Sequence, residues 1–143
     1  MNVSSILKTK GDRVVTARPD WTVSELSRQL KAERIGALVV SEDDSQIAGI
    51  VSERDIVRCL AEKGAAALDC RVDDIMQADV VTVTPDVAIE DVMATMTGHR
   101  IRHLPVVVDG KLAGIISIGD VVKHRLEALE SETEAMRHYI AGH

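Results

Sequence analysis

Apolar residues in this chain recur with the periods of helices and of buried strands. Two stretches carry apolar side chains at i, i+3 and i+7, the spacing of one helix face. These positions are Val23, Leu26, Leu30, Ile89, Val92 and Met96. Each stretch therefore predicts a helix with a single buried stripe.

Short aliphatic runs rich in β-branched residues predict strands, and the most apolar of them suit strands covered on both faces. The predicted strands are residues 13–16, 37–40, 47–51, 80–83, 104–108 and 112–116. Along the chain the pattern reads strand, helix, strand, strand, helix, and then the same order again. The pattern predicts an α/β fold.

The order of elements repeats because the sequence itself repeats. Gly-Ile-Val-Ser-Glu-Arg-Asp at residues 49–55 returns as Gly-Ile-Ile-Ser-Ile-Gly-Asp at residues 114–120, 65 positions later. A unit of this size, present twice, is too small to close a core alone and is expected to pack on its twin. The predicted division is residues 1–66, residues 67–126 and a C-terminal helix over residues 127–143.

Signals at the element ends refine this picture. The second helix of each unit is predicted to begin at about Asp55 or Asp120, and Gly64 predicts a left-handed end to the first of them. Each unit also has a short apolar lead-in, at residues 3–7 and 72–76. The helix-favouring C-terminal stretch allows two interpretations, a solvated helix with one packed edge or a dimer contact.

Composition places the chain among globular proteins with an aliphatic core, since 45% of its 143 residues are hydrophobic and none is Phe. A net charge of −6 disfavours nucleic acid as a partner. No apolar run reaches the roughly 18 residues of a membrane span, and the first residues lack a signal-peptide pattern, so a cytoplasmic location is expected. Cys59 and Cys70 fit no metal-binding spacing and are expected to be reduced thiols.

Two Ser-x-x-Asp boxes carry the candidate chemistry. Ser52 and Asp55, and again Ser117 and Asp120, lie where a buried strand runs into a helix. A helix N-terminus offers unpaired N–H groups and suits anions and hydroxyl-bearing ligands. The same spacing also makes a capping box, a purely structural role. Two boxes at matched positions favour a binding function.

A basic cluster distinguishes the second unit from the first. Arg102 and His103 enter a predicted strand where the first unit has Gly36 and Ala37. Contact with phosphate and a solvated charged face are both compatible with this cluster. No nucleophile elbow, phosphate-binding glycine loop or metal-ligand spacing occurs, so neither an enzyme nor a metal site is expected.

These motifs resemble a tandem pair of cystathionine-β-synthase (CBS) domains, in the stand-alone bacterial form associated with signal transduction. The resemblance covers nearly the whole chain. It implies an α/β (α+β) fold of two β-α-β-β-α modules packed around a pseudo-two-fold axis, with two clefts, and a homodimer. It further implies an adenosine-containing ligand. The basic residues favour AMP, ADP, ATP or NAD(H) over S-adenosylmethionine.

The resemblance also implies roles for particular residues. The aspartates would accept hydrogen bonds from ribose hydroxyls, the serines would contact sugar or phosphate, and the basic residues would hold phosphate. Carried over to this sequence, the nucleotide-binding residues are Ser52, Arg54, Asp55, Arg102, His103, Ser117 and Asp120. Because only the second unit has the basic pair, the cleft of Asp120 is expected to be the better one.

The leading expectation is a non-enzymatic regulatory module that senses adenine nucleotides through a change in the packing of its two units. Its output would pass through homodimer surfaces or to an effector protein of unknown identity. The alternative is a structural protein-interaction module with vestigial clefts, in which the Ser-x-x-Asp boxes only cap helices.

Overall fold

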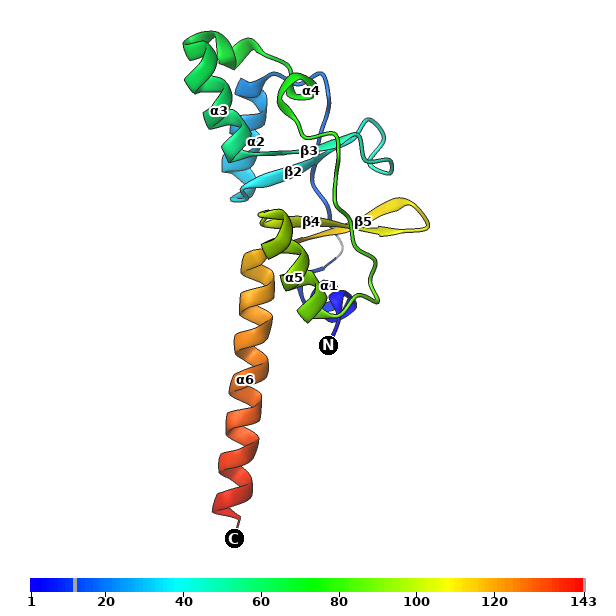
Figure 1. Cartoon of the computed structure of the whole chain (residues 1–143), viewed down its shortest axis with the longest axis vertical. Helices are drawn as coiled ribbons and strands as arrows, with labels where there is room; N and C mark the ends of the chain where they lie inside the picture. The colour runs from blue at the N-terminus through cyan, green and yellow to red at the C-terminus, as the bar shows by residue number, and fades with distance from the viewer. Residues whose placement is uncertain (12, 143) are drawn as a thin grey trace.

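The computed structural model describes residues 1–11 and 13–142, arranged as two units along the long axis of the molecule (Figure 1). In the first unit, β1 runs parallel to β2 and β2 antiparallel to β3. Its elements are β1 (Thr16–Ala17), α2 (Val23–Glu33), β2 (Ala37–Val40), β3 (Gly49–Ser52), α3 (Glu53–Lys63) and the 3-10 helix η1 (Gly64–Asp69). The predicted order of elements is confirmed in this unit.

The second unit repeats the order but lacks a full first strand. Its elements are α5 (Ile89–His99), β4 (His103–Val108), β5 (Lys111–Ser117) and α6 (Ile118–Ala141), with β4 and β5 antiparallel. The strand predicted at residues 80–83 is reduced to one parallel bridge between Val83 and Val106. Pro105 stands where Val39 pairs with Thr16 in the first unit, and proline has no N–H to extend the ladder. The α/β fold class is confirmed.

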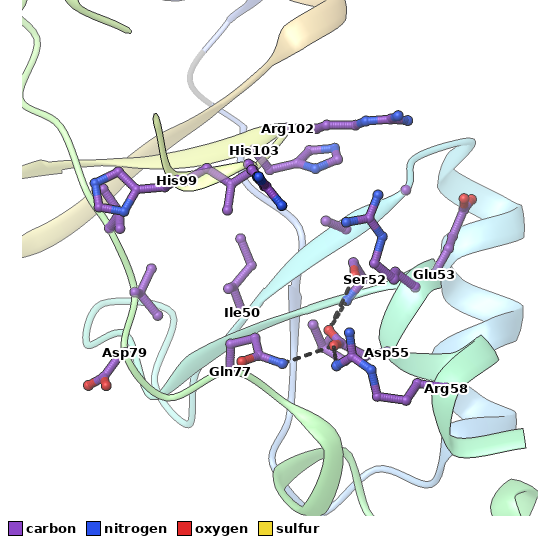
Figure 2. A pocket seen from close by; sticks show the side chains of 18 residues that line it. Ile50, Ser52, Glu53, Asp55, Arg58, Gln77, Asp79, His99, Arg102 and His103 are labelled. Atoms are coloured by element: carbon purple, nitrogen blue, oxygen red, sulfur yellow. Dashed lines mark hydrogen bonds and ion pairs between the residues drawn. The ribbon is translucent and has the colours of Figure 1, made fainter. Parts of the chain in front are cut away.

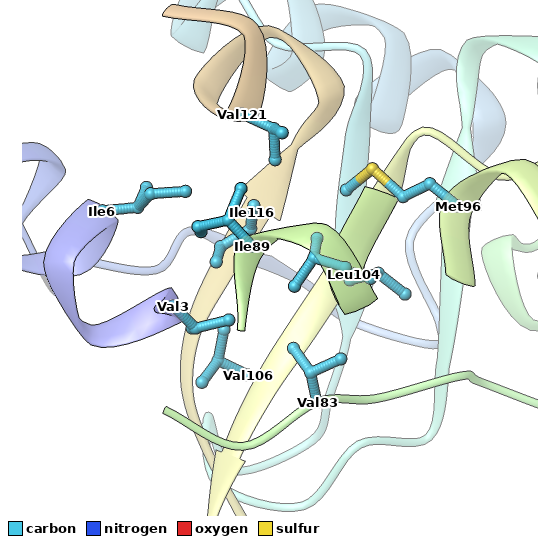
Figure 3. Close-up of a cluster of buried hydrophobic side chains, with 10 residues drawn as sticks. Val3, Ile6, Val83, Ile89, Met96, Leu104, Val106, Ile116 and Val121 are labelled. Carbon is cyan, nitrogen blue, oxygen red and sulfur yellow. The ribbon is translucent and has the colours of Figure 1, made fainter. Parts of the chain in front are cut away.

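The two lead-in segments exchange partners. They form α1 (Val3–Lys10) and α4 (Val72–Ile75). Val3 and Ile6 are buried in the core of the second unit, beside Leu104 and Val106 (Figure 3). In the same way Val72 is buried in the core of the first unit. Each core is therefore completed by a segment that precedes the other unit in sequence, which ties the two units together.

Both box helices begin two residues earlier than predicted. α3 starts at Glu53 and α6 at Ile118, each capped by the serine of its box. Asp55 and Asp120 thus occupy the third helical position, from which a carboxylate can reach back to the cap. At Gly64 the backbone has φ 60° and ψ −141°, which is not the predicted left-handed helical conformation, and the chain continues directly into η1.

α6 is a single helix of 24 residues, so residue 127, the predicted start of a C-terminal helix, lies inside it. The helix begins against α1, α5 and β5 and then projects from the body as a rod (Figure 1). Val121 is its one buried residue among those that the structure describes. Most of the length of α6 is therefore exposed.

Candidate functional site

A cleft of about 610 Å³ lies between the units, within the size range of small-molecule sites. Its walls come from β3 and the start of α3, from the segment after α4, and from the junction of α5 with β4. The polar side chains that matter below are Ser52, Arg54, Asp55, Gln77, Arg102 and His103. Both units thus contribute side chains to one cavity.

Asp55 is held in a fixed orientation on one wall of the cleft. Its side chain is only 6% exposed, and its Oδ2 accepts hydrogen bonds from the Ser52 N–H (2.9 Å) and hydroxyl (3.2 Å). Its Oδ1 accepts one from the Gln77 amide at 3.1 Å and lies 3.5 Å from the Arg58 guanidinium. The Ser52 hydroxyl and Arg58 make the longest contacts, which hydroxyl groups of a ligand can replace.

The opposite wall is basic. Figure 2 shows His99, Arg102 and His103 across the cavity from Asp55. With Arg54, Arg58 and Arg100, four arginines line the cleft, against three carboxylates. The cleft is therefore net positive in a chain whose net charge is −6, which favours an anionic ligand.

His103 lies in the lining of this wall, and its pKa is lowered, which favours the neutral imidazole. Burial lowers its pKa, and nearby Lys10 lowers it further, while Asp120 and Glu53 oppose the shift. A neutral imidazole in this place can accept a proton when an anion binds beside it.

The second box has a different environment. Asp120 Oδ2 accepts a hydrogen bond from the Ser117 N–H at 2.9 Å and forms an ion pair with Lys10 Nζ at 2.7 Å. Lys10 also donates to the Ile115 carbonyl at 2.8 Å. Burial favours a higher pKa for Asp120, but the hydrogen bonds from Lys10 and Ser117 outweigh it and the net pKa is lowered. Lys10 thus forms a close ion pair with this carboxylate, whereas Asp55 accepts a hydrogen bond from the neutral Gln77 and has its nearest cation, Arg58, at 3.5 Å.

The structure groups the predicted residues differently from the expectation. Arg102 and His103 line the same cleft as Ser52, Arg54 and Asp55. Ser117 belongs to a second, more open hollow of about 760 Å³ that also includes Arg102 and His103, and Asp120 lines neither. Arg102 and His103 thus face the aspartate of the first unit as well as Ser117 of the second, and the preference for the Asp120 cleft stays a prediction.

Sequence reasoning missed Arg58, His99 and Arg100 in the lining of the cleft. It also missed Gln77 and Lys10, which contact the two box aspartates. Each follows or ends a lead-in helix, α4 or α1, and each contacts the box aspartate of the unit on which that helix packs. Neither belongs to a recognisable motif. The available signal was that each lies shortly after the apolar part of a lead-in, Gln77 directly after residue 76 and Lys10 a few residues after residue 7.

Within residues 1–11 and 13–142 no three His, Cys, Asp or Glu side chains come together as a metal site would require. No helix in this part of the chain combines the length and the apolarity needed to cross a membrane.

Comparison with known proteins places this geometry in a family. The CBS domain profile matches residues 3–62 and 72–127. The mitochondrial CBS domain-containing protein CBSX3 of Arabidopsis thaliana is 34% identical, with 98% of this chain and 72% of that protein covered. The structure of the CBS-domain containing protein ATU1752 of Agrobacterium tumefaciens is 45% identical, with a TM-score of 0.85 over 87% of this chain and 99% of the other.

A more distant structure carries ligands. The CBS domain pair of protein MJ0100, in complex with 5-methylthioadenosine and S-adenosyl-L-methionine, superposes with a TM-score of 0.76. The alignment covers 86% of this chain and 98% of the other, at 24% identity. At that identity the likeness shows a shared fold.

Proposed function

Because the chain belongs to the CBS-domain family, as a tandem pair of these domains, we propose that it is a non-enzymatic regulatory module that binds an adenosine-containing ligand between its repeats. The observation that carries this proposal is the cleft in which buried Asp55 faces Arg102 and His103. A carboxylate suits the vicinal hydroxyls of ribose, and arginines suit phosphate. One cavity therefore offers both halves of a nucleotide a partner.

In the proposed mode of binding, the ribose hydroxyls lie on Asp55 and Ser52. The phosphates then extend towards Arg54 and Arg102, near the N-terminus of α3, where the helix dipole favours negative charge. Ile50 and the other aliphatic residues of the lining offer an apolar surface to the base. AMP, ADP, ATP and NAD(H) share these features, whereas the sulfonium of S-adenosylmethionine places a positive charge among arginines.

The ligand would act by bridging the two units. Asp55 belongs to the first unit, while Arg102 and His103 belong to the second. A ligand that contacts both favours the arrangement in which both contacts form, and only a difference in affinity between arrangements can shift the equilibrium. The proposed signal is this change in packing, read by an effector protein or by a second copy of the chain.

A panel of ligands tests the proposal. AMP, ADP, ATP, NAD and NADH are each added to the folded chain, with S-adenosylmethionine alongside, and the melting temperature is measured. A ligand that binds only the folded state raises this temperature in proportion to the logarithm of its concentration. If none of the six shifts it at saturating concentration, the alternative of an interaction module with vestigial clefts replaces the proposal.

Lys10 is expected to limit the chain to one ligand. Its ammonium group occupies the Asp120 carboxylate, so Lys10→Met should free that carboxylate and raise the binding stoichiometry from one to two per chain. Isothermal titration calorimetry measures this number. Lys8→Met removes an exposed lysine from the same helix and should leave it at one. A stoichiometry of two in the unmodified chain would contradict the prediction.

Affinity for a phosphorylated ligand is expected to rise as the pH falls through the pKa that His103 has in the complex. The pKa of His103 is lowered in the free protein, and a phosphate beside it would raise that pKa, so binding takes up a proton. The gain is at most about tenfold per pH unit for one proton. Calorimetry in buffers of different ionisation enthalpy measures the uptake.

His103→Gln provides the control for this pH dependence. Glutamine keeps a hydrogen-bonding side chain but does not titrate. The ligand's own phosphate contributes equally to proton uptake in both proteins, so the difference in proton uptake between them reports His103 alone. If both proteins take up the same number of protons, His103 is not the group that titrates.

A further inference from the structure

The projecting part of α6 carries an unpartnered apolar stripe. Met136 and Ile140 are 63% and 68% exposed, and Val122, Leu126 and Leu129 are also exposed. With Thr133 included, the stripe runs 122, 126, 129, 133, 136, 140, in steps of four and three residues. This alternation is the a/d pattern of a coiled coil, in which each apolar residue packs between residues of a second helix.

The heptad also fixes which residues flank the stripe. Positions a are Leu126, Thr133 and Ile140, and positions d are Val122, Leu129 and Met136. The flanking e positions are Lys123, Glu130 and Arg137, and the flanking g positions from the same turns are Arg125, Glu132 and Tyr139. In a coiled coil the charges at e and g select the partner and its orientation.

These flanking charges match a second copy of the same helix lying parallel and in register. There each g residue faces the e residue five positions later on the other chain. Arg125 then faces Glu130 of the second copy, and Glu132 faces Arg137. Both pairings are of opposite charge, and symmetry forms each of them twice. We propose that α6 forms a parallel two-stranded coiled coil with α6 of a second copy of this chain.

An antiparallel pairing centred on residue 131 aligns all six stripe positions but sets like charges together, Glu130 and Glu132 each against its own copy and Lys123 against Arg137. A second antiparallel register fits less of the helix. Centred between Leu126 and Leu129, it also pairs opposite charges, Arg125 with Glu132 and Lys123 with Glu130. It then sets Met136 against Gly119, at the point where α6 leaves the body. Ile140 would have to face residue 115, which lies in β5. The parallel pairing instead gives each of the six stripe positions a counterpart on the exposed helix.

The proposal does not rest on the ligand site. None of the stripe residues lines the cleft of Asp55, so loss of nucleotide binding and loss of the coiled coil are separable outcomes. The stripe extends over about 27 Å at a rise of about 1.5 Å per residue. Isolated peptides of this length form only marginally stable coiled coils. The experiments below therefore use the full chain.

Disulfide trapping tests the register. In a chain with Cys59→Ala and Cys70→Ser, Thr133→Cys places a thiol at a central a position, where it meets its own copy in the parallel pair. Glu134→Cys, one residue away and outside the seam, is the matched control. Under mild oxidation the Thr133→Cys chain is expected to form a covalent dimer on a non-reducing gel much faster than the control. Equal rates in the two variants overturn the proposal.

Charge exchange tests the orientation. Arg125→Glu and Glu130→Arg, each alone, set like charges against each other in the parallel pair, and each is expected to weaken dimerisation roughly tenfold. The double variant restores opposite charges and should return the dissociation constant close to that of the unmodified chain in sedimentation equilibrium. In the second antiparallel register the double variant mismatches both contacts, so dimerisation weaker than in either single variant overturns the parallel arrangement.

A third pair of variants tests the seam itself. Met136→Asp introduces a charge at a d position and is expected to abolish the dimer, whereas Ala135→Asp adds the same charge at a c position, outside the seam, and should leave the dimer intact. A dimer unchanged by Met136→Asp, or an unmodified chain that stays monomeric at the highest concentration tested, overturns the proposal.

Discussion

Asp55→Asn is expected to weaken binding of the adenosine-containing ligand about 100-fold, because hydrogen bonds to a charged group are worth about 1.5–3 kcal/mol each. The substitution removes the charge and one acceptor oxygen at nearly constant volume. The remaining carbonyl oxygen can still accept the hydrogen bond that the Ser52 N–H now gives to the carboxylate. The cap of α3 therefore survives while the partner of the ribose is lost. Calorimetric titration with the ligand that gives the largest thermal shift measures the effect.

Asp120→Asn is the matched control, since it makes the same change in the repeated box. Its carboxylate lies outside the Asp55 cleft and is already paired with Lys10. We expect its affinity to stay within about twofold of the unmodified chain, because no direct contact with the ligand is lost. A loss confined to Asp120→Asn would show that the ligand occupies the other cleft and would refute the assignment of Asp55.

Asp120→Asn should instead lower the stability of the fold at neutral pH and have little effect on it in acid. The pKa of Asp120 is lowered in the folded chain, so its ionised form stabilises the fold above the unfolded pKa of about 4. This contribution is lost as the pH falls through the lower, folded value. The asparagine variant lacks the contribution at every pH, so the two proteins should converge in melting temperature only in acid.

The sequence predicts the elements well where one local period dominates. β2 forms over the predicted residues 37–40, and α2 and α5 bury the predicted stripes. The strand expected at residues 80–83 fails for a non-local reason, since the missing donor belongs to Pro105 on a neighbouring strand. Local patterns therefore predict which segments extend, whereas pairing depends on the partner strand.

It is harder to predict from the sequence which unit a segment packs against. The lead-ins at residues 3–7 and 72–76 are apolar in the expected way, but each is buried in the core of the other unit. This exchange brings Gln77 to Asp55 and Lys10 to Asp120. The two Ser-x-x-Asp boxes therefore differ, because Asp55 contacts the Gln77 amide and Asp120 contacts the Lys10 ammonium group. The asymmetry thus arises from the lead-ins, outside the repeated motif.

The glycines that open the repeated motif are explained by the same exchange. A Cβ on Gly49 would lie 2.6 Å from the Met76 sulfur and 2.8 Å from the Gln77 carbonyl oxygen. A Cβ on Gly114 would lie 2.8 Å from Cδ2 of Leu7. In both units a lead-in lies where a Cβ would point, but the obstacle includes a backbone carbonyl at Gly49 and is only the end of a leucine side chain at Gly114.

Gly49→Ala is therefore expected to destabilise the fold by about 2–3 kcal/mol, and Gly114→Ala by less than about 1 kcal/mol. The end of the Leu7 side chain can rotate away. The Gln77 carbonyl cannot, because it accepts the Ile50 N–H at 2.9 Å while the Gln77 N–H donates back to Ile50 at 2.8 Å. Urea unfolding of both variants measures the difference.

Gly49→Ala should also weaken ligand binding, since displacing Gln77 removes the hydrogen bond that orients Asp55. Gly114→Ala contacts no part of that cleft and should bind normally, which separates loss of orientation from general loss of stability. Equal free energies of unfolding for the two variants would mean that the backbone at Gln77 yields as easily as a leucine side chain. Normal ligand affinity in a folded Gly49→Ala chain would mean that Asp55 needs no support from Gln77.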